Sequence, residues 1–112
     1  MDFLSACQKL VSIDSSPSQG NIEAVQFLKG LSESMGFEAV VTEEIVNGIN
    51  QANISIKSSE KEPKILLQTH LDTIDPGSFA LWDKTGFNPY QASIRGSKIY
   101  GLGTAAAKLD FL

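Results

Sequence analysis

The sequence predicts an α/β fold in which two N-terminal helices precede a mixed β-sheet. Apolar residues recur at helical spacing over residues 2–13 and again over 22–35. β-branched residues then dominate 37–46, and apolar and polar residues alternate over 52–57, as expected for strands. The apolar run within 64–72 is typical of a buried strand, and in open α/β sheets ligand sites lie where such strands end.

The composition indicates one small domain and narrows its partners. The chain has 112 residues, of which 42% are hydrophobic and 20% charged, enough for a modest core. A net charge of −4 argues against a nucleic-acid backbone or an anionic membrane surface as partner. The single cysteine, Cys7, excludes an internal disulfide and suits a reducing compartment. Without a basic signal segment or a long apolar run, we expect a cytoplasmic protein.

Turn-forming residues separate the expected elements of the N-terminal half. Residues 14–20 are rich in Ser, Pro and Gly, and Asn21 after them is a candidate N-cap for the second helix. Asn47-Gly48 predicts a tight turn between two strands. Residues 58–63 should form a charged loop before the apolar run.

The C-terminal half is less regular. Residues 78–91 should form an irregular segment, and 94–100 a small hairpin around Gly96-Ser97. Thr104 could cap a helix that begins at Ala105. The sum of these elements is a fold with helices first and mostly strands after them.

The His70-x-Asp72 pair is the strongest chemical feature. His70 is the only histidine, and side chains two residues apart on an extended chain point to the same side. A neutral imidazole is a good zinc ligand, and a neighbouring carboxylate can hold it in the required tautomer. On the pair alone a purely structural hydrogen bond is the favoured interpretation, because this short spacing is common.

Two further features have a functional and a structural interpretation. Gly101-x-Gly103 before a helix could bind an anion, but it lacks the third glycine of a dinucleotide motif, so a nucleotide-binding domain ranks last. A tight turn explains the two glycines as well. Trp82 and Tyr90 are candidates for a substrate pocket, although packing of an irregular loop is the favoured interpretation.

Taken in order, these motifs resemble the zinc-dependent amidohydrolases and peptidases that include acetylornithine deacetylase, succinyl-diaminopimelate desuccinylase, aminoacylase and carboxypeptidase G. The resemblance spans nearly the whole chain, and it includes the stretch from Val11 to Ser15 before Pro17. The other matching residues are His70-Leu71-Asp72, Thr73-Ile74-Asp75-Pro76, Trp82, Pro89-Tyr90, the stretch from Gly96 to Gly103, and Lys108.

The resemblance implies a role for each site position. His70 would bind one zinc ion, and Asp72 would orient His70 without touching the metal. The aspartate that bridges two zinc ions in this family would fall at position 106, where this chain has Ala106. Asp110, one helical turn further on, is too distant to replace it. An intact site would hold two Zn²⁺ ions, with Co²⁺ as an alternative metal.

The resemblance therefore predicts that residues 1–112 are the N-terminal part of a phosphorylase/hydrolase-like zinc-peptidase catalytic domain, without the rest of that domain or the dimerisation domain. An intact relative would cleave a linear amide bond in an N-acyl amino acid or small peptide, and could be a homodimer. We expect this chain to be inactive, because the position-106 ligand and the downstream ligands are absent. The alternative is a non-catalytic α/β interaction module that retains only the fold.

Overall fold

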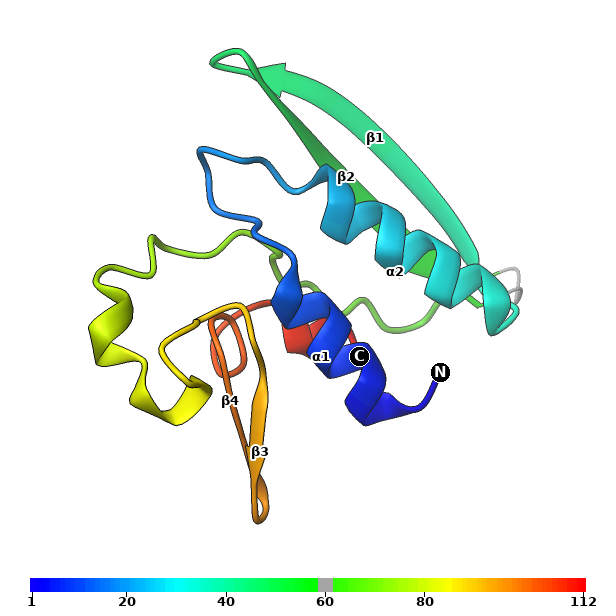
Figure 1. Ribbon diagram of the computed structural model, residues 1–112. Helices are drawn as coiled ribbons and strands as arrows, with labels where there is room; N and C mark the ends of the chain where they lie inside the picture. The colour runs from blue at the N-terminus through cyan, green and yellow to red at the C-terminus, as the bar shows by residue number, and fades with distance from the viewer. Residues whose placement is uncertain (59–61) are drawn as a thin grey trace.

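The computed structural model of the chain describes residues 1–58 and 62–112 (Figure 1). The two predicted helices are present as α1 (Phe3–Ser12) and α2 (Ile22–Ser34). The side chain of Asp2 caps α1 by accepting a hydrogen bond of 2.8 Å from the backbone nitrogen of Ser5. Both helices bury one apolar face, as their helical spacing predicted.

Asn21 does not have the capping role that the sequence predicted, because its side chain makes no capping hydrogen bond to α2. It bonds instead to Ala52 in the second strand of the hairpin. Its Nδ2 donates to the Ala52 carbonyl oxygen, and its Oδ1 accepts from the Ala52 nitrogen, each at 2.8 Å. The amide therefore ties the start of α2 to the sheet.

The two strands after α2 form an antiparallel hairpin of β1 (Glu38–Val46) and β2 (Ile49–Lys57). Asn47 and Gly48 form the predicted turn, with φ angles of 51° and 78°. Helix α2 lies across one face of this hairpin (Figure 1). The core between α1, α2 and the hairpin contains Leu10, Ile13, Ala24, Val25, Leu28, Ala52 and Leu71.

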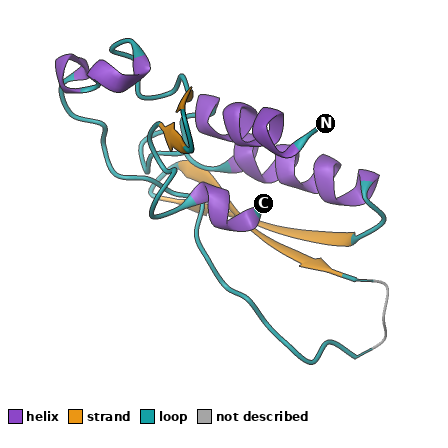
Figure 2. Cartoon of the chain, turned by 90° about the horizontal axis from the view of Figure 1, so that it is seen from below, coloured by secondary structure: helices purple, strands orange, loops and turns teal. Residues whose placement is uncertain are grey.

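The predicted buried strand over 64–72 is not formed. Ile65, Leu66 and Leu67 are 80%, 86% and 89% exposed, and residues 63–78 carry no helix or strand. A strand needs a neighbour for its backbone hydrogen bonds, but the strands of the described residues pair only as β1 with β2 and β3 with β4. The segment therefore runs as a long loop (Figure 2).

The sheet is consequently not mixed, as the sequence had predicted; the described residues form two antiparallel sheets of two strands each. The second is the predicted hairpin around Gly96-Ser97, formed by β3 (Ser93–Arg95) and β4 (Lys98–Tyr100). Residues 59–61, within the expected charged loop of 58–63, lie outside the described residues.

Residues 78–91 are irregular, as expected, apart from the short 3₁₀ helices η1 (Phe79–Leu81) and η2 (Asp83–Thr85). The helix expected from Ala105 is not formed. Residues 101–107 make turns, and a 3₁₀ helix, η3 (Lys108–Phe111), follows them and packs against α1 (Figure 1).

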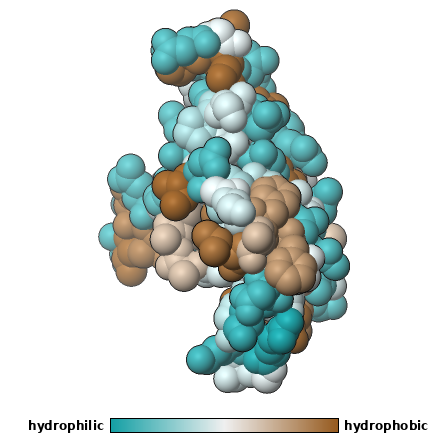
Figure 3. Space-filling view, turned by 60° about the vertical axis from the view of Figure 1, so that its left-hand side comes forward, coloured by the Kyte–Doolittle hydropathy of each residue, from teal (hydrophilic) through white to brown (hydrophobic). Residues whose placement is uncertain are grey.

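The surface mixes polar and apolar side chains, with apolar ones gathered in the middle of the face shown in Figure 3. Within the described ranges, no helix has both the length and the apolar character needed to cross a membrane.

Candidate functional site

A cavity of about 690 Å³ opens where the end of the 64–72 segment meets the turns that follow β4. Three stretches line it: residues 16–18 after α1, residues 70 and 72–75, and residues 101–107. These stretches are far apart in the sequence, so the cavity depends on how the chain folds back on itself. It contains both residues of the His70-x-Asp72 pair and position 106.

His70 and Asp72 are in direct contact at this cavity. The Nδ1 atom of His70 lies 2.9 Å from the main-chain oxygen of Asp72 and 3.2 Å from its Oδ1. Both neighbours are acceptors, so Nδ1 carries the proton and donates it. Nε2 then keeps its lone pair, and the two side chains are 57% and 60% exposed. The imidazole is therefore in the tautomer that can bind a metal through Nε2.

The backbone around this pair is held by the loop after α1. The hydroxyl of Ser15, which is buried, donates a hydrogen bond of 2.6 Å to the main-chain oxygen of Leu71. The backbone nitrogen of Thr73 donates to the main-chain oxygen of Ser15 at 3.4 Å. Sequence reasoning missed Ser15, because nothing distinguished it from the other polar residues of the turn.

Lys108 holds the opposite side of the site. Its backbone nitrogen donates to the main-chain oxygen of His70 at 3.2 Å, and its Nζ donates to the main-chain oxygen of Ile13. The side chain is fully buried, at 0% exposure. Burial lowers the pKa of Lys108 from 10.5 to about 8, and the nearby carboxylate of Asp14 opposes part of this shift. Its sequence position gave no sign of this burial.

Trp82 and Tyr90, the two candidates for a substrate pocket, are not among the residues that line this cavity. The indole nitrogen of Trp82 donates to the main-chain oxygen of Pro76 at 2.9 Å, which fixes the irregular loop. Tyr90 lies near Asp14; burial, reinforced by that carboxylate, raises the pKa of Tyr90 to about 12. Both aromatic residues therefore have packing contacts that account for their positions.

Position 106 faces the same cavity as His70, but Ala106 offers only a methyl group. Asp110, the carboxylate that follows position 106 in the sequence, lies elsewhere. It is not among the residues that line the cavity, and its Oδ2 accepts a hydrogen bond of 3.2 Å from the hydroxyl of Thr69. The role of position 106 as a ligand position remains a prediction.

The donors present do not fit a two-metal centre. Within residues 1–58 and 62–112, no group of three or more His, Cys, Asp or Glu side chains is close enough to hold a metal ion. One buried hydroxyl at the cavity wall, Thr73 Oγ1, has no hydrogen-bond partner among the described residues, but zinc prefers nitrogen, sulfur and carboxylate ligands. The side chains at this cavity that could bind a metal are His70, Asp72 and Asp75, and they do not form such a group.

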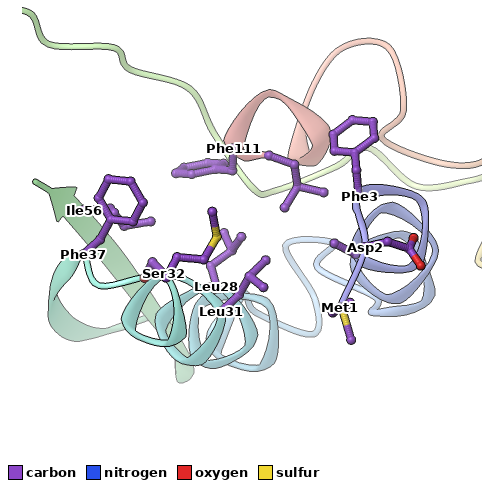
Figure 4. Close-up of a pocket in the computed structure, with 12 residues that line it drawn as sticks. Met1, Asp2, Phe3, Leu28, Leu31, Ser32, Phe37, Ile56 and Phe111 are labelled. Carbon is purple, nitrogen blue, oxygen red and sulfur yellow. The ribbon is translucent and has the colours of Figure 1, made fainter.

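A second cavity, of about 360 Å³, lies between α1, α2 and η3 (Figure 4). Apolar side chains make up most of its wall, including Leu28, Leu31 and Phe111. Its one carboxylate, Asp2, is the N-cap of α1. This cavity therefore offers no arrangement of groups for catalysis.

Comparison with known proteins identifies the class. The chain is 32% identical over 105 residues to an acetylornithine deacetylase of Vibrio vulnificus (strain CMCP6), a match that covers 94% of this chain and 26% of the relative. Acetylornithine deacetylase of Aliivibrio fischeri (strain MJ11) matches with the same identity and coverage. An uncharacterized metallohydrolase of Methanocaldococcus jannaschii is 41% identical over 58 residues, which is 51% of this chain and 13% of that protein. No family model and no solved structure matches the chain.

These relatives define the class as metal-dependent hydrolases. Over nearly its whole length the chain is similar to the family that includes acetylornithine deacetylase, as the order of its motifs predicted. It spans about a quarter of the length of the acetylornithine deacetylases that it matches.

Proposed function

We propose that residues 1–112 are the N-terminal segment of the catalytic domain of a metal-dependent hydrolase that cleaves an amide bond of an N-acyl amino acid or a small peptide. The contact between His70 and Asp72 carries this proposal, since it leaves Nε2 free beside the cavity that also contains position 106. The name of the acetylornithine deacetylases that align over 94% of the chain supports a small N-acyl substrate. The intact protein would hold two zinc ions, or cobalt in their place, and could form a homodimer.

Each site residue has a separate role in this proposal. His70 would bind one zinc ion through Nε2, and Asp72 would fix the tautomer and orientation of the imidazole. Ala106, which lines this cavity, would stand where the family has the ligand that bridges the two ions. Because a methyl group cannot coordinate a cation, the chain has no donor set for two metals, and we expect no hydrolysis from it.

The substitution Ala106→Asp tests this assignment. It adds a carboxylate to the wall of the cavity that contains His70, and zinc affinity should rise by more than about tenfold, the effect that outer-shell partners alone can produce. Zinc affinity is measured by competition with a chromophoric chelator. In a longer parent protein that carries this segment, the same change should raise amide hydrolysis steeply.

Two controls separate coordination from simple charge attraction. Ala105→Asp adds the same charge one residue away on the same wall, and should give a much smaller gain in zinc affinity. His70→Ala, combined with Ala106→Asp, should abolish the gain. A folded Ala106→Asp chain that binds zinc no better than the unsubstituted chain would contradict the proposed site.

The alternative function is a non-catalytic α/β interaction module. Ala106, together with the absence of a donor cluster among the described residues, favours it. A module of this kind should be monodisperse and melt in one cooperative transition, and zinc should not change its melting temperature. A segment of a larger domain should melt broadly or aggregate instead, because it exposes apolar residues such as Leu66 and Leu67.

A further inference from the structure

Lys108 is a lysine that no solvent or substrate can reach. It is 0% exposed, and it is not among the residues that line the cavity containing His70. Burying an ammonium group is unfavourable unless it gains hydrogen bonds or a neighbouring opposite charge. Any role of Lys108 therefore depends on its contacts within the protein.

Those contacts join three segments that are far apart in the sequence. The ammonium group donates to the main-chain oxygen of Ile13, just after α1, and Asp14 beside it supplies an opposite charge. The backbone nitrogen donates to the main-chain oxygen of His70. The aliphatic stem packs against Gly103, where an added Cβ would come within 2.9 Å of Lys108 Cδ.

The backbone conformation of Lys108 is a second indication that the surrounding contacts constrain this residue. Its φ angle is +33°, in the left-handed region that residues other than glycine seldom adopt. Such a conformation persists where the surrounding contacts impose it. The residue before it, Ala107, is extended, so the chain changes direction between the cavity wall and η3.

We propose that Lys108 is a positioning residue that locks the 101–107 turn against the main chain of His70, so that residue 106 and His70 face one cavity. The inference rests on the proposed function only in taking this cavity as the reaction site. The ammonium group ties Lys108 to the main-chain oxygen of Ile13, and the backbone nitrogen of Lys108 in turn holds the main-chain oxygen of His70. A side chain of the same length without N–H donors should fill the space but lose the contact with Ile13 and so loosen the lock.

The variant that tests this is Lys108→Met, which keeps an unbranched stem and removes the three N–H donors. Lys98→Met, at an exposed position in β4, is the matched control. Residue-resolved hydrogen exchange should show about tenfold faster exchange at the backbone amides of residues 102–108, the change expected when a charge-assisted hydrogen bond is lost. The amides of α2 should keep their protection, and Lys98→Met should change neither set.

A second measurement uses the metal alone. In chains that carry Ala106→Asp, Lys108→Met should lower zinc affinity by about tenfold, and Lys108→Gln, which retains an amide donor, should lower it less. Unchanged exchange at 102–108, or exchange that rises equally throughout the chain, would overturn the positioning role. Unfolding of both Lys108 variants would also overturn it, by showing a general structural role.

The two proposals fail in different ways. If Ala106→Asp gains no zinc affinity but Lys108→Met still loosens residues 102–108, the metal assignment fails and the lock remains. If Ala106→Asp gains affinity and Lys108→Met changes neither exchange nor affinity, the lock fails and the metal assignment remains.

Discussion

The buried ammonium of Lys108 predicts how the stability of the protein depends on pH. The pKa of Lys108 is about 8 in the folded protein, against 10.5 for an ordinary lysine. Below pH 8 the lysine is charged in both the folded and the unfolded chain. Between about pH 8 and 10.5 the unfolded chain still binds a proton that the folded chain has released, so the free energy of unfolding rises with pH across this window.

The size of this rise follows from the difference between the two pKa values. A pKa difference of about 2.5, at about 1.4 kcal/mol per pKa unit, corresponds to about 3.5 kcal/mol. The Cys7 thiol, whose pKa is raised by burial, and Tyr90, whose pKa is raised to about 12, act in the opposite direction as pH rises. Asp14, the charged group that faces Lys108, has a lowered pKa: burial raises it, but hydrogen bonds from Ser16 outweigh that effect, so Asp14 stays ionised throughout.

The assay compares the unsubstituted chain with Lys108→Met by urea unfolding at a series of pH values from 7 to 11. Cys7 and Tyr90 are common to both proteins, so the difference between the two curves isolates Lys108. The stability of the unsubstituted chain relative to Lys108→Met should rise by about 3.5 kcal/mol over this range. Two parallel curves would refute the claim that the Lys108 ammonium is buried in the folded protein.

Two pairs of substitutions test the packing by the same unfolding assay. Leu10→Ala should lower the free energy of unfolding by about 2–5 kcal/mol, because Leu10 is fully buried. Leu66→Ala, at an 86% exposed position, should change it by less than about 0.5 kcal/mol. A large loss at Leu66 would mean that the 64–72 segment is buried. Gly20→Ala should lower the free energy of unfolding by more than about 1 kcal/mol, since φ is +80° and the new Cβ would lie 2.3 Å from a main-chain oxygen of β2. Gly30→Ala, in open space on α2, should raise it by about 0.5–1 kcal/mol. Equal effects of the two substitutions would contradict these backbone conformations.

Local patterns in the sequence were sufficient to predict the helices and hairpins. Helical spacing of apolar residues located α1 and α2, because each helix buries one face against the core. Asn47-Gly48 and Gly96-Ser97 marked the two hairpin turns, in which Asn47, Gly48 and Gly96 adopt the positive φ angles that Asn and Gly tolerate. Each of these features depends on residues close together in the chain.

Features that depend on distant partners were not predicted. The apolar run over 64–72 has the composition of a buried strand, but a strand forms only where another strand pairs with it. Asn21 looked like a helix cap, yet its amide finds better partners on Ala52, 31 residues away. The expected helix from Ala105 gives way to turns, because Lys108 adopts a left-handed conformation where that helix should have continued.

The distinction between local patterns and distant partners also applies to the cavity that contains His70. A spacing of two residues predicted that His70 and Asp72 would share one side of the chain, and their side chains lie 3.2 Å apart. No local pattern marked Ser15 and Lys108 as supports of the site, since their hydrogen bonds reach partners 56 and 95 residues away. The metal-ligand roles of His70 and position 106 remain predictions.

The hydrogen bonds that support the cavity can be compared with the metal ligands that the chain lacks. Ser15, Thr73 and Lys108 hold the backbone around His70 through main-chain hydrogen bonds, and none of these bonds involves a group that would bind a metal. The framework therefore does not depend on the residue at position 106, whose methyl group lies at the cavity wall. If this is correct, the chain lacks ligands rather than architecture, and one added carboxylate should meet an imidazole that is already oriented.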